Sequence, residues 1–307
     1  MSVKFITCVY SDLHGTEFGG RPSRGGHYRY SLLSILKMTD ADFLCYTSDR
    51  EIQGLQDFFY VENGIEKKRI EFRTFDLSNT KFQNLISKYK DIDGTKKSDR
   101  CVEIQYSKFH WWWTEDKTYD YYFWIDAGLS HCGIIPNKYL TGGPGFSEYF
   151  HSSIFDNNFL KNLCEFTENK FFMISKDNVK HYWSGTVNRS WYKEFCMDLH
   201  IIGGLFGGHK DTWDSVVSLF ENYTQDIISV DNVLPHEENV MSLMYYNHKE
   251  LFVTKYFETW WHEDNYHSFY GHNDEEIKTE FFVNNKSFYK VLEELCDTQK
   301  NSKNKTI

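Results

Sequence analysis

Short apolar runs alternate with segments of helical periodicity along the first half of the chain. Short continuous apolar runs predict buried strands, and apolar residues three or four positions apart predict helices. The predicted strands are Val3–Tyr10, Asp42–Thr47, Ile70–Phe75 and Tyr121–Asp126. The predicted helices are Tyr28–Lys37, Lys81–Lys90 and Cys101–Trp113. Strands separated by helices favour an α/β domain whose sheet is largely parallel.

The pattern of the second half is less regular. Phe171–Ser175 predicts a short strand, and Ile201–His209 predicts a glycine-rich strand or bend. Asp211 is expected to cap a helix, because apolar residues recur at i, i+3, i+4 and i+7 from Trp213. The remaining helices are expected near Pro235 and over Phe288–Leu295.

One continuous domain fits the length and composition. The chain has 307 residues, 40% of them hydrophobic, and no linker rich in Pro or Ser. This apolar content suffices for a large core. We therefore expect a domain over residues 1–296 and a polar tail at 297–307.

The charge balance narrows the classes of partner. Lys and Arg number 34 against 44 Asp and Glu, a formal net charge of −10, which disfavours general binding of nucleic acid. No apolar run approaches the roughly 20 residues of a membrane span. The segment Val3–Ile6 is too short for a secretory signal. We expect a cytoplasmic protein, either free or peripheral to the inner membrane at its cytoplasmic face.

The seven cysteines are widely spread, and no CxxC motif occurs. An odd number without a paired motif indicates reduced thiols in the core, and it argues against a zinc site.

The loop after the first predicted strand allows two interpretations. Asp12 and His14 are spaced like the first ligand pair of a metallophosphoesterase. Such an enzyme also needs a Gly-Asp-x-x-Asp loop, which is missing, and the segment Gly271–Asp274 has its residues in the wrong order. We reject that interpretation. The glycines beside Arg21 and Arg24 instead suit either a phosphate-binding loop or an ordinary surface loop.

The strand that ends at Asp126 is the most informative segment. Its aromatic and apolar residues predict a central strand that is buried on both faces. Open α/β sheets bind ligands at the carboxyl ends of their strands. Ala127 and Gly128 follow and leave the next turn uncrowded, so we expect Asp126 to be functional.

Three further markers follow Asp126 along the chain. Gly203–His209 places four glycines around one phenylalanine, which allows close approach to a flat ligand. Glu237 and Glu238 stand at a predicted helix start, where the helix dipole favours carboxylates. Glu258–His267 mixes tryptophans with histidines. Each marker alone has an ordinary structural explanation.

In this order the four markers resemble a nucleotide-sugar-dependent glycosyltransferase of the GT-A fold. More closely, YYFWIDAGLSHCGIIPNKYL and GGLFGGHKDTW followed by PHEENVMSL look like the HtrL/YibB (WlaTC-type) bacterial family, which is tied to surface polysaccharide gene clusters. The resemblance extends from about Phe5 to the segment Glu258–His267.

The resemblance implies a single GT-A-like, Rossmann-type α/β domain, with a mixed, mainly parallel central sheet flanked by helices. It implies a nucleotide-binding half at about 1–130 and an acceptor half at about 131–296. The implied activity is transfer of a hexosyl or N-acetylhexosaminyl group from a UDP-sugar to a glycan acceptor. That acceptor would belong to surface polysaccharide or lipooligosaccharide synthesis.

The resemblance also implies roles for individual residues. Asp126 and one of Glu237 or Glu238 would be catalytic. The residues expected to bind the donor nucleotide are Thr7, Tyr10, Arg21, Arg24, Tyr46, Arg100, Lys108 and Gly128. The residues expected to flank the sugars are Trp183, Gly203 and Gly204.

A divalent cation, Mn²⁺ or Mg²⁺, is implied on the donor diphosphate. The motif Asp126-Ala127-Gly128 lacks the second carboxylate usual in this fold. Asp126 would hold the ion with His262 or His267, and His131 is a weaker candidate. Alternatively, no metal is used and basic side chains neutralise the diphosphate; these are Arg21, Arg24, Arg100 and Lys108.

Two other functions stay open at this point. Gly128, in place of a carboxylate, is compatible with a nucleotide- or carbohydrate-binding protein of the same fold that has no turnover. A nucleotidyltransferase also uses an α/β sheet, but it would need an early glycine-rich loop with a lysine, and this loop has only arginines.

Overall fold

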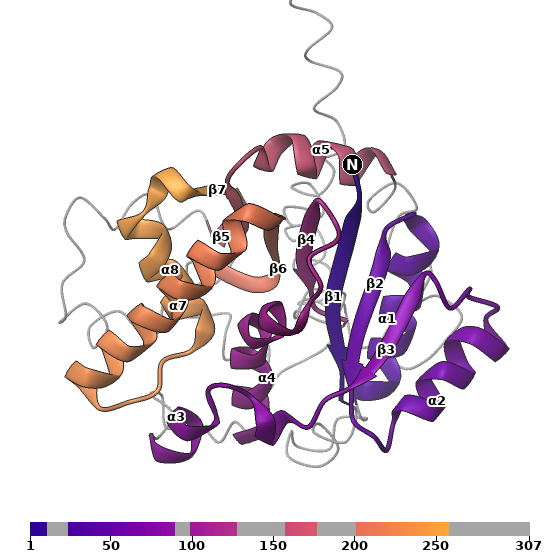
Figure 1. Ribbon diagram of the computed structural model, residues 1–307, viewed down its shortest axis with the longest axis horizontal. Helices are drawn as coiled ribbons and strands as arrows, with labels where there is room; N and C mark the ends of the chain where they lie inside the picture. The colour runs from indigo at the N-terminus through magenta and orange to yellow at the C-terminus, as the bar shows by residue number, and fades with distance from the viewer. Residues whose placement is uncertain (11–23, 90–98, 128–156, 177–200, 258–307) are drawn as a thin grey trace, which may run out of the picture.

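Seven strands form one mixed sheet in the computed structural model, which describes residues 1–10, 24–89, 99–127, 157–176 and 201–257 (Figure 1). The strand order is β3-β2-β1-β4-β6-β5-β7. The strands are β1 (Val3–Val9), β2 (Asp42–Thr47), β3 (Ile70–Thr74), β4 (Tyr121–Ile125), β5 (Phe171–Lys176), β6 (Ile201–His209) and β7 (Phe252–Phe257).

The sheet changes direction in its middle. Strands β3, β2, β1 and β4 are parallel, and β6 runs antiparallel to both β4 and β5. Strand β7 is parallel to β5. From β1 the chain goes first to β2 and β3 on one side and then returns to β4 on the other. The order therefore reverses between β1 and β4, and in open α/β sheets this switch point is where ligands bind.

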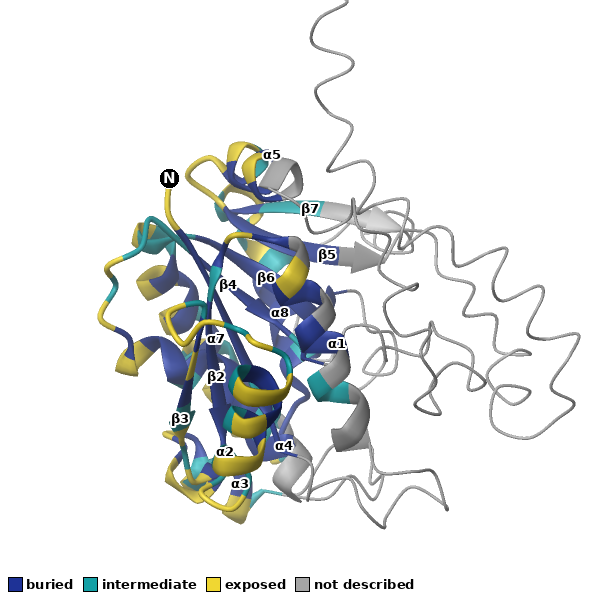
Figure 2. Ribbon diagram, turned by 90° about the vertical axis from the view of Figure 1, so that its right-hand side faces the viewer, coloured by how far each residue is buried: buried dark blue, intermediate teal, exposed yellow. Residues whose placement is uncertain are grey.

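Helices cover both faces of the sheet, and each face has its own apolar core. One core joins the sheet to α1 (Arg24–Met38), α2 (Ile52–Gln56) and α5 (Asn157–Thr167). The other joins it to α3 (Gln83–Lys88), α4 (Asp99–His110), α7 (Lys210–Asp231) and α8 (Glu237–Asn247). Figure 2 shows the strands buried between helices whose outer faces are exposed. None of the helices in the described ranges has both the length and the apolar character needed to cross a membrane.

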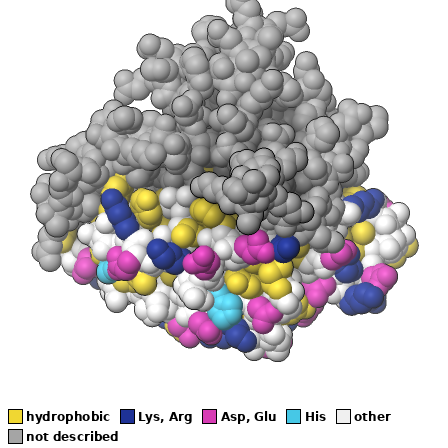
Figure 3. Space-filling view, turned by 90° about the horizontal axis from the view of Figure 1, so that it is seen from above, with side chains coloured by type: hydrophobic (Ala, Val, Ile, Leu, Met, Phe, Trp, Pro, Cys, Tyr) yellow, Lys and Arg dark blue, Asp and Glu magenta, His cyan; other side chains and the backbone are white. Residues whose placement is uncertain are grey.

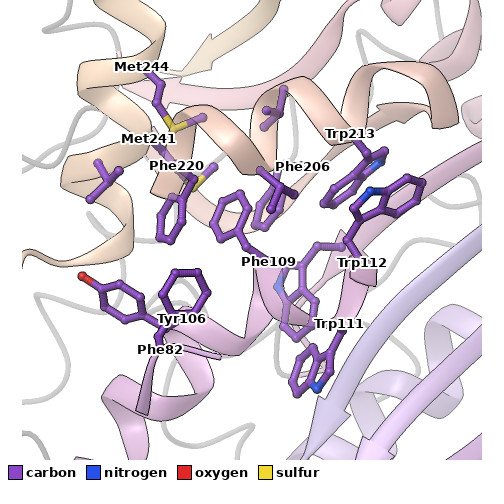
Figure 4. Packing of buried hydrophobic residues seen from close by; sticks show 14 of the residues in the cluster. Phe82, Tyr106, Phe109, Trp111, Trp112, Phe206, Trp213, Phe220, Met241 and Met244 are labelled. Carbon is purple, nitrogen blue, oxygen red and sulfur yellow. The ribbon is translucent and has the colours of Figure 1, made fainter. Parts of the chain in front are cut away.

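Aromatic rings dominate the core on the α4 face (Figure 4). The ring of Phe109, from α4, stacks on Phe220 of α7 and Phe206 of β6, with centroid distances of 3.9 Å and 5.3 Å. Trp112 stacks on Trp213 at 5.1 Å. These contacts attach α4 to the second half of the chain, so residues far apart in sequence share one core.

The predicted fold class is confirmed: the domain has a mixed, mainly parallel sheet flanked by helices. Strand β2 has the predicted bounds, and the segment Ile201–His209 is a strand rather than a bend. Helices α2 and α5 and strand β7 were not predicted. The predicted helix Phe288–Leu295 lies outside the described ranges.

The capping prediction for Asp211 is wrong. Helix α7 begins at Lys210, directly after β6, so Asp211 already lies in its first turn. The cap is His209, whose Nδ1 accepts a hydrogen bond from the Asp211 N–H at 3.4 Å.

Candidate functional site

Asp126 lies directly after β4, at the carboxyl end of the central strands and next to the switch point. Its backbone N–H donates to the Gly204 carbonyl at 2.8 Å, which continues the pairing of β4 with β6. Trp124 Nε1 donates to Asp126 Oδ1 at 2.6 Å. The Asp126 side chain keeps 32% of its surface exposed. The carboxylate is therefore both held in place and open to solvent.

Lys108 reaches this carboxylate from α4. Its Nζ lies 3.2 Å from Asp126 Oδ1, 3.2 Å from Glu237 Oε1 and 3.0 Å from the Gly203 carbonyl oxygen. The side chain is only 6% exposed. An ammonium has three N–H donors, and three oxygen atoms face it here.

Glu237 and Glu238 open helix α8 and have different partners. Glu237 pairs with Lys108, and its side chain is 3% exposed. Its second oxygen, Oε2, is buried and has no hydrogen-bond partner within the part of the chain that the structure describes. Glu238 Oε1 instead accepts a hydrogen bond from the Gly203 N–H at 2.8 Å, which ties α8 to β6.

Gly203 is the point where these side chains converge. A Cβ on Gly203 would lie 3.0 Å from Glu237 Oε1 and 3.1 Å from Lys108 Nζ. A side chain at this position would press on both charged groups and shift them by a few tenths of an ångström, so glycine favours their close approach. We refer to Lys108, Asp126, Glu237, Glu238 and Gly203 as the Lys108 cluster.

The charges of the cluster change the acidity of neighbouring groups. Burial lowers the pKa of Lys108, but the carboxylates of Asp126, Glu237 and Glu238 raise it by more, so the net pKa lies well above its ordinary value. Lys108 is therefore a cation at every physiological pH. Burial, with Cys45 and Asp126 adding to it, raises the pKa of the nearby Cys8 thiol well above its usual range.

The expected nucleotide residues on the first strands make their described contacts with residues outside the cluster. Thr7 is fully buried, and its neighbours Phe5 and Val9 belong to the core on the α1 side, opposite the cluster. The Tyr10 hydroxyl donates to the Phe75 carbonyl at 2.9 Å. The Tyr46 hydroxyl donates to Glu115 Oε1 at 3.1 Å. The structure thus gives both hydroxyls partners within the fold.

The remaining expected residues fall into two groups. Arg24 and Arg100 lie in the first turns of α1 and α4, respectively. The others lie outside the described ranges; they are Arg21, Gly128, His131, Trp183, His262 and His267.

Sequence reasoning missed two features, one beside Asp126 and one elsewhere in the sheet. Trp124 lies two residues before Asp126 on the same strand face, so the period of a strand could have predicted its contact with the carboxylate. Glu115 is fully buried and pairs with Lys4 and Arg73, each at 2.9 Å. This second network fastens the segment before β4 to β1 and β3, and the sequence carries no local signal for it.

Comparison with known proteins places the fold. No protein-family model and no curated protein matches the sequence. Among solved structures, mouse xyloside xylosyltransferase 1 in its apo form matches with a TM-score of 0.50 and 10% identity, over 92% of this chain and 94% of that one. The chain shares the fold of a glycosyltransferase. The GT-A-like fold is therefore confirmed, while the resemblance to the HtrL/YibB family stays a hypothesis.

A second solved structure is 4-diphosphocytidyl-2C-methyl-D-erythritol synthase from Anaerococcus prevotii. It matches with a TM-score of 0.40 and 10% identity, over 94% of this chain and 96% of that one. This similarity is too low to bear on fold or function.

The described side chains do not by themselves fit a divalent cation. Within these ranges no group of three or more His, Cys, Asp and Glu side chains could hold a metal ion. Asp126 Oδ1 already faces the Lys108 ammonium and the Trp124 N–H. The expected divalent cation stays a prediction that depends on His262 or His267, both of which lie outside the described ranges.

Proposed function

We propose that the protein is a glycosyltransferase that moves a sugar from a nucleotide-diphosphate sugar, a UDP-sugar, to a glycan acceptor. The observation that carries the proposal is Asp126, a solvent-accessible carboxylate at the end of the central strand beside the switch point. The fold shared with a xylosyltransferase supports it. The resemblance in sequence supports surface polysaccharide or lipooligosaccharide as the class of product.

The reaction breaks the bond between the sugar C1 and the diphosphate oxygen, and the electron pair leaves with the nucleoside diphosphate. A bond forms between C1 and an acceptor hydroxyl oxygen, whose proton must be taken up. The site has to orient the donor, stabilise the departing negative charge and exclude water. In this proposal Asp126 orients the donor from the carboxyl end of β4.

Glu237 is the better candidate of the two glutamates for contact with a sugar hydroxyl. Glu238 is occupied with the backbone of Gly203. Glu237 has a buried oxygen, Oε2, without a partner in the ranges that the structure describes. Buried polar atoms normally have hydrogen-bond partners, and an exception calls for an explanation. A substrate hydroxyl would supply the missing donor, and in an inverting reaction Glu237 would accept the proton.

A binding protein of the same fold without turnover is the second candidate. Its support is the Lys108 ammonium, which already neutralises part of the carboxylate charge that an enzyme of this fold would use. Measured release of the nucleoside diphosphate from the donor sugar separates the two functions.

Ligand-induced stabilisation tests the proposed donor class. The purified chain is heated with UDP-, GDP-, CMP- and dTDP-sugars, each with and without Mn²⁺, and the melting temperature is recorded. A nucleotide sugar at about 100 times its dissociation constant should stabilise the fold by about 2.7 kcal/mol. UDP-sugars are expected to give the largest increase.

Two variants make this test specific. Asp126→Asn removes the charge at the site and should abolish most of the increase as well as sugar transfer. Asp226→Asn, at an exposed position on α7, is the matched control and should behave like the unmodified protein. A melting temperature that no nucleotide or nucleotide sugar changes would contradict the proposed function.

A further inference from the structure

The positive charge of Lys108 suggests that it binds phosphate, but its contacts in the structure are with oxygen atoms of the protein. A lysine near a diphosphate site is expected to bind phosphate, but three oxygen atoms of the protein already face its ammonium. The side chain is 6% exposed, whereas that of Asp126 is 32% exposed. Asp126 is the more exposed member of this ion pair, and the three N–H donors of Lys108 already face oxygen atoms of the protein.

The three oxygen atoms come from elements that are distant along the chain. Asp126 follows β4, Gly203 lies on β6 and Glu237 begins α8, while Lys108 itself lies on α4. A single ammonium therefore sets the distance between two carboxylates that would otherwise repel each other. Gly203 favours this arrangement, since a Cβ there would press on both Lys108 and Glu237.

We propose that Lys108 is a positioning residue: it holds the carboxylates of Asp126 and Glu237 in place and does not contact the donor diphosphate. This inference rests on the proposed function, since the two carboxylates have a role in catalysis only if the protein is a glycosyltransferase. Its test does not require a substrate. Asp126 keeps a fixed orientation because Lys108 and Trp124 Nε1 both contact the same oxygen, Oδ1. Trp124 is consequently a spectroscopic reporter of the cluster. Lys108 Nζ also lies over its ring, 5.5 Å from the centroid, so loss of the ammonium acts on the signal directly as well, and Gly203→Ala, which keeps the ammonium, is the decisive variant.

The test follows the indole N–H signal of Trp124 by NMR in protein labelled with ¹⁵N-tryptophan. The signal is assigned by its loss in Trp124→Phe. In Lys108→Met, Asp126 loses one of the two side-chain partners that it has among the described residues, and the Trp124 signal should shift while those of distant tryptophans stay in place. A Trp124 signal at the wild-type position in folded Lys108→Met would overturn the inference.

Gly203→Ala distinguishes the effect of moving the Lys108 ammonium from the effect of removing its charge. It retains every charged group of the cluster but displaces Lys108 and Glu237 through the new methyl group. The Trp124 signal should shift in this variant as well. Gly54→Ala is the control, because nothing lies within 4 Å of a Cβ built there. An unchanged signal in Gly203→Ala would count against positioning by Lys108.

A double variant covers the case in which Lys108→Met does not fold, since it leaves a buried carboxylate without its partner. Lys108→Met with Glu237→Gln removes both charges of that pair and should restore folding. Its Trp124 signal should still be displaced, and a wild-type signal would overturn the inference.

Addition of UDP to the wild-type sample then tests the proposed function separately. A spectrum that UDP leaves unchanged would contradict nucleotide-sugar binding, and the comparison of variants without UDP would still decide the role of Lys108.

Discussion

Gly207 shows how strictly a single position in β6 is constrained. Its φ is +149°, and a Cβ there would lie 2.2 Å from the Tyr122 carbonyl oxygen of β4. Gly207→Ala should therefore lower the free energy of unfolding by about 3 kcal/mol or more, because the backbone of the sheet has to shift. The measurement is urea denaturation followed by circular dichroism.

The control for this variant is Gly54→Ala, at an exposed helical position with open space around it. It should leave the protein as stable or raise its stability by roughly 0.5–1 kcal/mol. Equal effects of the two substitutions would show that β4 and β6 do not approach each other as closely as described.

His110 makes the stability depend on pH. Burial lowers the pKa of His110, and Lys81 lowers it further. The unfolded chain therefore binds more protons than the folded one just below the ordinary histidine pKa of about 6.5, so stability falls as the pH drops through that value. The backbone N–H of Lys81 donates to His110 Nδ1 at 3.0 Å, which requires an unprotonated nitrogen.

Urea denaturation at about pH 7.5 and about pH 5.5 checks this prediction. His110→Gln retains an acceptor for the Lys81 N–H but does not titrate, so its loss of stability between the two pH values should be smaller than that of the wild type. An identical loss in both proteins would exclude His110 as the cause.

At the scale of elements, α4 is the connection between the two halves of the chain. It carries Lys108 toward the site and Phe109 into the core, where the Phe109 ring stacks on Phe206 and Phe220 (Figure 4). Phe109→Ala should cost about 3–5 kcal/mol of unfolding free energy, because a fully buried ring leaves a cavity. Denaturant unfolding measures the loss.

Val61→Ala serves as the control for this prediction. Val61 is 77% exposed, so truncation should change the unfolding free energy by no more than about 0.5 kcal/mol. A cost for Phe109→Ala as small as that of the control would mean that α4 is not held by this aromatic contact.

At the scale of the whole molecule, one sheet contains strands from both the first and the second half of the chain. The core on the α4 face likewise draws on residues from Ile6 to Phe252. Because neither half can lose its strands without exposing this shared core, we expect one cooperative unfolding transition. Tryptophan fluorescence and far-ultraviolet circular dichroism should give the same midpoint, and two separate midpoints would contradict the prediction.

The surface carries charged side chains of both signs, as expected from a sequence with 34 Lys and Arg and 44 Asp and Glu. In the view of Figure 3, acidic and basic side chains of the described residues are interspersed with apolar ones. On that face the charge of the described side chains is mixed rather than of one sign, so any recognition of an anion there would have to be local.

The sequence alone predicted the features that depend on local patterns. Short continuous apolar runs identified the buried strands, including β2 at its observed bounds, and the abrupt end of the aromatic run identified Asp126. It also named Lys108, Gly203 and Glu237 as candidates, although with separate roles. Helix α2 and strand β7 were not predicted from the sequence, because such short segments show too little periodicity to be distinguished from loops.

Only the tertiary structure decided which candidates meet. Lys108, Asp126, Gly203 and Glu237 come together because the strand order places β6 beside β4 and packs α4 and α8 over that junction. The face on which Thr7 lies is a different matter: alternation along β1 puts it on the side of Phe5 and Val9, opposite the cluster. Side-chain alternation within a strand is a local property of the backbone, whereas strand order arises from contacts between residues far apart in sequence, which no local pattern encodes.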